Sequence, residues 1–512
     1  MEFISILNDV LGPVMRGPSS SHTAGSYHIG RIARSLLGEE PVRATFVFDP
    51  GGSYAKTYTQ QAADLGFAAG LMDWPLTDDR FPKSLELADA RGIRMEFRTE
   101  SLEHEDHPNT VKMRLVSKNG MQLTAVAKSV GGGGVAFTEL EGWPVSLDGK
   151  THDVFVLCKT GSERKVQELL EGSASHARTT RDGEVFLSFQ RAFPLDSDVR
   201  SQIEAEGGVE KVWAAAPVFY TKRGEPLFVS SEEMIQAAQD EGCSLGRMAL
   251  LYEARLLGIS EEDVLAEMER RLEIMDASLA RGLQDDNLRM QLLRPTAGKI
   301  FRAESEGKVA VGGLHTRVAA GAMAVMHVSN SRGVVCAAPT GGSAGVIPGV
   351  VIVLAKEKKS SSREACLALL AAGAIGLIIL RRATFAAEVA GCQVEIGAAG
   401  AMASAAVIEI AGGSPRQAVD AAAISLQNTM GSTCDLVQGI CEIPCHTRNA
   451  IAASSALVCA DLIMGGYENP IPLDETIDAV FSSGQMLPRE LRCTALGGLA
   501  MAPSAQSLPR LK

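Results

Sequence analysis

Small residues and helical spacing dominate the second half of the chain and restrict it to closely packed helices. The chain has 51 glycines and is 46% apolar, but only 5% of its residues are aromatic. Helices whose contact positions carry small side chains can approach one another closely. After Ser230, apolar residues recur at helical spacing, with Ser, Asp and Gly as caps and stops at the segment edges. We expect helices over 232–258, 260–282, 361–381 and 414–431.

The chain before this helical half has two other patterns. Residues 1–148 have the mixed pattern of an α/β domain, and residues 150–222 have the element order β-α-β-β-α-β of a small ferredoxin-like module. The predicted fold class is therefore α+β and multidomain, with a large all-α domain over 230–512. In the first domain we expect helices over 23–37 and 60–72, strands over 42–48, 111–116 and 122–126, and glycine-rich loops at 17–21 and 131–134.

The charge of the chain excludes two classes of partner. Its 49 Lys and Arg stand against 61 Asp and Glu, which gives a formal net charge of −12. Phosphate backbones and anionic lipid surfaces select basic proteins, so we expect neither a nucleic acid nor a membrane as partner. Residues 1–14 lack the basic start and long apolar run of a secretory signal, so the expected location is cytoplasmic.

Three cysteines stand beside predicted helix boundaries instead of within an apolar stripe. Cys392 precedes one helix, Cys434 follows another, and Cys445 opens a third. Thiolates at helix ends can converge on one point, and an iron–sulfur cluster is a partner that thiolates select strongly. Ordinary buried cysteines are an equally good interpretation of the spacing, whereas zinc is disfavoured because no Cys-x2-Cys pair occurs.

The sequence around these cysteines resembles a known family. The segment Ala390-Gly391-Cys392-Gln393-Val394-Glu395-Ile396-Gly397 is followed by 41 residues to Cys434 and 10 more to Cys445. Together with Ala338-Pro339-Thr340-Gly341-Gly342 and Gly17-Pro18-Ser19-Ser20-Ser21-His22-Thr23, this closely resembles the iron–sulfur-dependent L-serine dehydratases, in a single-chain form with fused beta-type and alpha-type domains. His107-Pro108-Asn109-Thr110 and residues 129–133 also have counterparts in that family.

The resemblance implies a cofactor and a reaction. Cys392, Cys434 and Cys445 would hold a [4Fe-4S] cluster whose fourth iron has no protein ligand. Iron at the open position would act as a Lewis acid on the β-hydroxyl of L-serine, and loss of water would lead to pyruvate and ammonia. No lysine stands in a context that suggests a pyridoxal phosphate aldimine.

The loop near the start of the chain is the candidate substrate site. Its hydroxyls, its imidazole and the N–H groups of the following helix suit a carboxylate, although a plain Ser or Thr N-cap explains such a sequence equally well. We expect His22 to be catalytic. The resemblance adds Ser53, Thr340 and Gly341 to the pocket, which gives the substrate-binding set Ser20, Ser21, His22, Thr23, Ser53, Thr340 and Gly341.

Two departures from the family pattern leave alternatives open. Gln61 stands where the family has a histidine, so the general base is uncertain and the substrate could instead be threonine or a 2-(hydroxymethyl)glutarate-like diacid. Cys441, four residues before Cys445, could be a fourth thiolate that closes the cluster, as in a non-catalytic iron–sulfur sensor, but we expect it to pack as a small apolar residue. The remaining cysteines are also expected to pack in the core, among them Cys336 and Cys493.

The resemblance extends to assembly and regulation. The 150–222 module resembles, by element order, the ACT-like regulatory domains attached to some of these dehydratases. The glycine signature with which such domains bind amino acids is hard to find in it, so it would serve as a spacer or a dimerisation surface. We expect the protein to be a homodimer.

Overall fold

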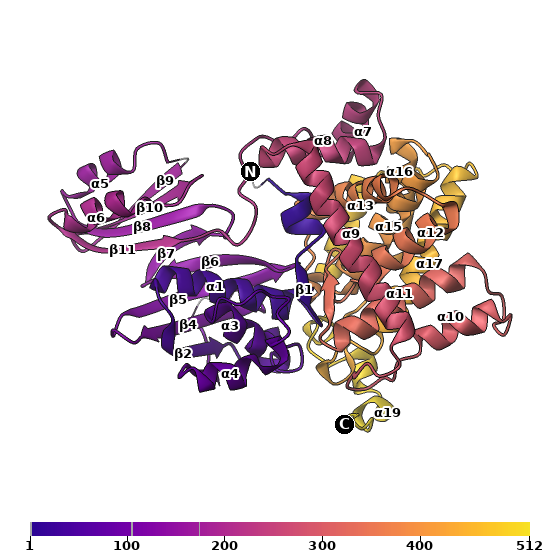
Figure 1. Ribbon diagram of the computed structural model, residues 1–512, viewed down its shortest axis with the longest axis horizontal. Helices are drawn as coiled ribbons and strands as arrows, with labels where there is room; N and C mark the ends of the chain where they lie inside the picture. Colours follow the sequence, from indigo (N-terminus) through magenta and orange to yellow (C-terminus); the bar gives the residue numbers. More distant parts are fainter. Residues whose placement is uncertain (1–2, 104–105, 174, 512) are drawn as a thin grey trace.

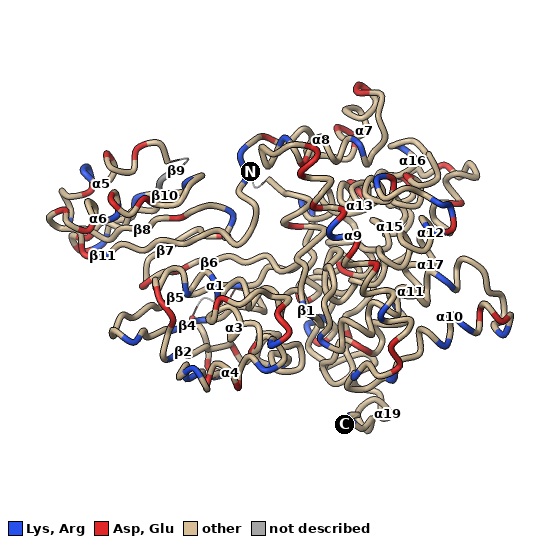
Figure 2. The backbone as a smooth tube through the Cα atoms, in the orientation of Figure 1, with Lys and Arg blue, Asp and Glu red and all other residues tan. Residues whose placement is uncertain are grey.

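The computed structural model describes residues 3–103, 106–173 and 175–511. A β-rich part formed by the first 220 or so residues lies beside a larger helical part (Figure 1). Lys and Arg are interspersed with Asp and Glu over both parts (Figure 2). The predicted fold class, an α+β chain with a helical second half, is confirmed.

The first unit contains a six-stranded sheet in the order β3-β2-β4-β5-β6-β7. Strands β2 and β3 run parallel and the other pairs are antiparallel. Strand β4 alternates buried and exposed residues, as expected of a sheet covered on one face, and α1 packs against β5 and α3. The elements are α1 (Gly25–Leu37), β2 (Pro41–Phe48), α2 (Ser53–Thr57), α3 (Ala63–Leu71), α4 (Ser84–Ala90), β3 (Arg94–Thr99), β4 (Thr110–Ser117), β5 (Gln122–Gly131), β6 (Gly134–Leu140) and β7 (Trp143–Leu147).

The module that follows has the predicted ferredoxin-like order. Its antiparallel sheet has the order β11-β8-β10-β9. Trp143 of the first unit stacks on Phe186 of the module, so the two sheets share a hydrophobic cluster. The elements are β8 (His152–Lys159), α5 (Glu163–Leu169), β9 (Ser175–Arg181), β10 (Glu184–Arg191), α6 (Ser197–Ala205) and β11 (Val209–Ala215).

The helical part has the close packing that its small residues predict. A Cβ on Gly282 of α9 would lie 2.0 Å from the carbonyl oxygen of Ala324 on α11, and one on Gly349 of α12 would lie 2.7 Å from Ala322 N. The helix expected over 232–258 is two helices, α7 and α8. The helices are α7 (Ser231–Asp240), α8 (Leu245–Leu257), α9 (Glu261–Gln284), α10 (Ala297–Ser305), α11 (Leu314–Asn330), α12 (Val346–Lys358), α13 (Ser362–Arg382), α14 (Ala387–Ala390), α15 (Ile396–Ile410), α16 (Pro415–Thr429), α17 (Cys445–Met464), α18 (Leu473–Gln485) and α19 (Pro503–Gln506).

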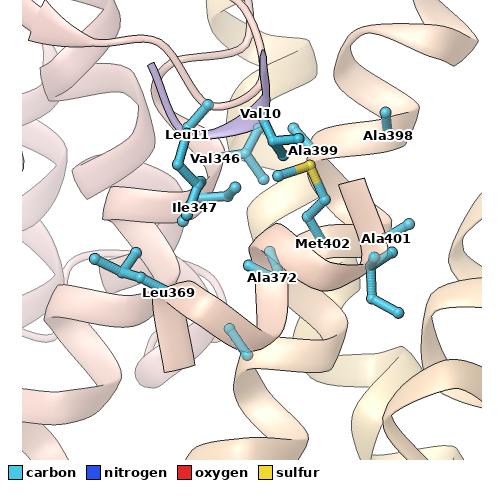
Figure 3. Packing of buried hydrophobic residues seen from close by; sticks show 14 of the residues in the cluster. Val10, Leu11, Val346, Ile347, Leu369, Ala372, Ala398, Ala399, Ala401 and Met402 are labelled. Atoms are coloured by element: carbon cyan, nitrogen blue, oxygen red, sulfur yellow. The ribbon is translucent and has the colours of Figure 1, made fainter. Parts of the chain in front are cut away.

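The start of the chain packs into the helical part, although it precedes the α/β unit directly in the sequence. Val10 and Leu11 lie among Val346, Ile347 and Met402 (Figure 3). Strand β1 (Val14–Arg16) then pairs antiparallel with β12 (Val334–Cys336). This segment joins the two parts of the molecule directly ahead of the predicted substrate loop.

Two helical stretches, Ser362–Arg382 and Cys392–Ile410, are long and apolar enough to cross a membrane. Both are core helices of this fold, because 78% and 83% of their most apolar windows are buried against other elements.

Candidate active site

Two loops that are 321 residues apart in the sequence meet at the predicted substrate site. Ser19 precedes the helical turn η2 (Ser20–Ala24), which leads into α1. The backbone N–H of Gly341 donates to Ser20 Oγ at 3.1 Å, and a Cβ on Gly341 would lie 2.8 Å from Ser20 N. Only glycine permits this approach, so the loop before α12 rests on the serine turn.

His22 lies at the centre of a buried hydroxyl network. Its Nδ1 is 3.0 Å from Ser21 Oγ, and its Nε2 is 2.9 Å from Thr57 Oγ1 and 3.4 Å from Ser53 Oγ. Burial lowers the pKa of His22 to about 4, although the Glu388 carboxylate acts in the opposite direction. The imidazole is therefore neutral at pH 7 and can accept a proton.

The capping interpretation of the serine loop is correct for Ser19. Its hydroxyl accepts from His22 N at 3.2 Å, and its carbonyl oxygen accepts from Thr23 N at 2.8 Å. These two N–H groups are therefore not free to bind a carboxylate. This differs from the expectation that the N–H groups at the start of the helix bind the substrate. The Thr23 hydroxyl donates to the carbonyl oxygen of Gln61 at 2.8 Å, so it fixes the segment that differs from the family pattern.

Glu388 on α14 joins the serine turn to the cysteine region. Its Oε1 accepts from Ser21 Oγ at 2.6 Å and from Asn109 Nδ2 at 3.1 Å, and lies 3.5 Å from His22 Nδ1. Burial acts to raise the pKa of Glu388, but the imidazole of His22 and these donors outweigh it and lower the pKa below its usual value. Sequence reasoning did not find this residue, because a lone Glu four residues before a cysteine has no distinctive pattern.

Two of the predicted cluster ligands, Cys392 and Cys434, lie together in a buried group of thiols, and the third, Cys445, lies beside Cys441 and Arg448. Cys392 opens the short helix η4 (Cys392–Val394), and its sulfur, the Cys434 sulfur and a Glu395 carboxylate oxygen all lie within 4.8 Å of one another. Cys445 is the first residue of α17. Arg448, one turn further on, donates to the Cys392 sulfur at 3.8 Å and places a positive charge beside Cys392 and Cys445.

Two further cysteines, Cys441 and Cys493, lie in this group. The thiol of Cys445 raises the pKa of Cys441 well above its usual value, together with burial and the nearby Cys392. The thiols of Cys392 and Cys493 act in the same way on Cys434. We had expected both Cys441 and Cys493 to pack as core residues. The position of Cys441, four residues before Cys445, indicated a possible fourth ligand. Cys493 lies far along the chain outside any motif and could not be singled out. Cys336, by contrast, lies on β12, with its thiol directed to Leu11 O.

Cys493 connects the two halves of the site. Ser53 Oγ donates to its carbonyl oxygen at 3.1 Å, and Gln61 Nε2 lies 3.6 Å from its sulfur. Its backbone N–H donates to Cys434 O at 2.9 Å. The hydroxyl network around His22 and the thiol group are therefore neighbours in one buried region.

A second, half-buried carboxyl group, that of Glu395, lies beside the thiols. Burial raises the pKa of Glu395 to about 7, while Thr340 Oγ1 donates to its Oε1 at 2.6 Å. Thr340, predicted from its motif, is thus linked to the cysteine side of the site, and Gly341 is linked to the serine turn. Glu388 and Glu395 differ in the direction of their pKa shifts, which is typical of sites that move protons.

Comparison with known proteins agrees with this arrangement. Residues 192–500 match the family described as serine dehydratase alpha chain. This chain belongs to the serine dehydratase family. It is 36% identical over 285 residues to the probable L-serine dehydratase alpha chain of Bacillus subtilis, which covers 56% of this chain and 95% of that protein.

One polypeptide here is similar to both chains of the two-chain serine dehydratases. The probable L-serine dehydratase beta chain of Bacillus subtilis is 42% identical over 158 residues, 31% of this chain and 69% of that protein. The L-serine dehydratase of Streptomyces coelicolor is 31% identical over 279 residues, 54% of this chain and 61% of that protein. The resemblance inferred from the motifs is thereby confirmed.

Proposed function

We propose that this protein converts L-serine to pyruvate and ammonia with a [4Fe-4S] cluster held by Cys392, Cys434 and Cys445. The observation that supports this most strongly is the contact between the His22 network and the thiol group through Glu388 and Cys493. The names of the similar proteins indicate the same substrate.

The donor set fits an iron–sulfur cluster. All five thiols of the group are buried, and neighbouring thiols raise the pKa values of Cys434 and Cys441 because adjacent thiolates repel one another. A cationic cluster iron removes that repulsion, and thiolates are its usual ligands. When bound, such a cluster supplies a Lewis acid that stabilises the oxygen leaving from the substrate.

The residues of the chain would bind the substrate and move its proton. Ser20, whose oxygen accepts from the Gly341 N–H, offers its hydroxyl proton to the substrate carboxylate. Ser21, Thr340 and Ser53 line the pocket with hydroxyls that donate to Glu388, Glu395 and Cys493 O, and Thr23 positions Gln61. Neutral His22 would accept the α-proton, through the hydroxyls that its two nitrogens contact. Loss of that proton and of hydroxide gives aminoacrylate, which tautomerises and is hydrolysed by water to pyruvate and ammonia.

One alternative function is favoured by the extra thiols. Cys441 or Cys493 as a fourth ligand would close the cluster, and the protein would then be an iron–sulfur sensor without catalytic activity. Gln61 supports a second alternative, a dehydratase of threonine or of a 2-(hydroxymethyl)glutarate-like diacid.

Wider features of the proposal concern the whole molecule. We propose a beta-type domain over 1–148, an ACT-like module over 150–222 that serves as a spacer or a dimerisation surface, and an alpha-type catalytic domain over 230–512. The assembly would be a homodimer in the cytoplasm, a location consistent with ten free cysteines.

The test is turnover by the anaerobically reconstituted full chain. Iron and sulfide are counted, and ammonia release is measured with L-serine and L-threonine, and dehydration with 2-(hydroxymethyl)glutarate. We expect about four irons per chain and turnover fastest with L-serine. A chain that binds iron but dehydrates none of the three compounds would contradict the proposal and favour the sensor.

A further inference from the structure

Glu388 is a buried anion without a permanent cation beside it. Its side chain is only 3% exposed, and among the described residues no Lys or Arg lies within salt-bridge distance of it. The ionisable groups that interact with it are the imidazoles of His22 and His107, the carboxyl group of Glu395, the Cys493 thiol and the Tyr54 hydroxyl. Burial lowers the pKa of both imidazoles, so both are neutral at pH 7 and Glu395 only adds negative charge.

Such an arrangement is costly unless a cation completes it. A buried charge that lacks a partner carries a desolvation penalty of several kcal/mol. The hydrogen bonds from Ser21 and Asn109 reduce the penalty but supply no positive charge. Other buried carboxylates of this protein accept hydrogen bonds on both of their oxygens. Glu253, for example, accepts from Ser5 and from the backbone N–H groups of Ile6 and Leu7, on both of its oxygens.

The side-chain contacts of Glu388 and Asn109 leave two oxygen atoms without a side-chain donor. The Ser21, Asn109 and His22 contacts all fall on Oε1, and none of the described side chains donates to Oε2. Asn109 is fully buried, and while its Nδ2 donates to Glu388, its Oδ1 has no partner among the described residues. An amide with its oxygen toward the carboxylate would be repelled, so the observed orientation of Asn109 is fixed. Among the described side chains, neither Glu388 Oε2 nor Asn109 Oδ1 therefore has a donor, and the remaining contact of the carboxylate is with the backbone N–H of Glu388 itself.

We propose that Glu388 and Asn109 bind the α-ammonium group of the substrate. This inference rests on the proposed function, and it assigns the substrate class as an α-amino acid. An ammonium group brings one positive charge and three N–H donors, which is what this pair of acceptors lacks. Glu388 is therefore a specificity-determining residue. A hydroxy acid or diacid without the amino group would leave the buried carboxylate unpaired and would bind more weakly than L-serine.

The experiment compares two ligands that differ only in the amino group. L-serine is the substrate, and 3-hydroxypropanoate, which is L-serine without its amino group, is the competitive inhibitor. Both are measured with the reconstituted wild-type chain, with Glu388→Gln, with Glu388→Asp and with Asn109→Ala. Glu253→Gln is the matched control, because it neutralises another buried carboxylate away from the site. Iron and sulfide contents are determined for each protein.

We expect Glu388→Gln to raise the KM for L-serine by about 30-fold or more, as for loss of one partner of a buried charge pair. Its kcat should change less, its inhibition constant for 3-hydroxypropanoate should stay within about twofold, and its iron content should be unchanged. Glu388→Asp should retain part of the affinity because it keeps the charge, Asn109→Ala should raise the KM in the same direction, and Glu253→Gln should leave it unchanged.

Two results overturn the inference. One is a KM for L-serine in Glu388→Gln within twofold of wild type, and the other is equal weakening of L-serine and 3-hydroxypropanoate, which indicates a structural role. The proposed function fails separately, if the wild-type chain itself releases no ammonia from L-serine.

Discussion

Gly341→Ala tests whether the two substrate loops must touch. The Cβ of alanine would lie 2.8 Å from Ser20 N and 3.0 Å from Pro18 O, where ordinary contacts begin at 3.4 Å. Both neighbours are backbone atoms, so the loops must separate by about 0.6 Å, and relief by a side-chain rotation is not possible. Overpacking of this kind costs about 1 to 3 kcal/mol of stability.

The effect on turnover should exceed the effect on stability. A shift approaching 1 Å in a catalytic constellation can reduce the rate by about 100-fold. We therefore expect kcat/KM for L-serine to fall about 10- to 100-fold, while iron content is retained because the thiol group is not displaced. The assay is anaerobic pyruvate formation, with thermal unfolding measured in parallel. Gly207→Ala is the control, because a Cβ there meets nothing within 4 Å. Wild-type kcat/KM in folded Gly341→Ala would refute the argument.

Three further predictions concern protons and ligands. His22→Gln removes the neutral proton acceptor, so kcat should fall by about 100- to 10,000-fold at unchanged iron content, and a smaller fall would remove His22 from this role. Cys434→Ser should lose iron and sulfide on anaerobic reconstitution whereas Cys366→Ser should not, and full iron in Cys434→Ser would contradict the ligand assignment. Burial lowers the pKa of His28 to about 4, so the unfolded chain binds a proton on this imidazole more tightly than the folded chain does. The contribution of neutral His28 to the free energy of unfolding is fully present above pH 6.5 and falls by about 2 kcal/mol as the pH drops to 5. His28→Gln, which keeps a donor for Gly133 O, should show a correspondingly smaller loss of unfolding free energy between pH 7 and pH 5, and an equal loss would contradict the assignment.

Local patterns predicted most of the secondary structure. Strand β2 and the helices α9, α13 and α16 lie within a few residues of their predicted ranges, because their periodicity and caps are properties of short segments. The pairing of β1 with β12 was not predicted. It joins residues more than 300 positions apart, and the register of such a pair is set by tertiary packing.

In the candidate site, too, some residues could be predicted from local motifs and others could not. Cys392, Cys434 and Cys445 could be singled out because each stands at a helix end within a motif. Cys493 and Glu388 reach the site only through the fold, which brings the loop after α18 and the short helix α14 against the serine turn. Thr23 occurs in the predicted motif, but the structure assigns its hydroxyl a bond to Gln61 O.

The central claim is that a substrate-accessible iron lies beside the His22 network. It is tested most directly by electron paramagnetic resonance of the reduced, anaerobically reconstituted protein before and after addition of L-serine. Binding of the substrate hydroxyl to one iron predicts a changed spectrum, and 3-hydroxypropanoate at saturating concentration should change it as well. A spectrum that neither compound alters would mean that four protein ligands close the cluster, and would contradict the account.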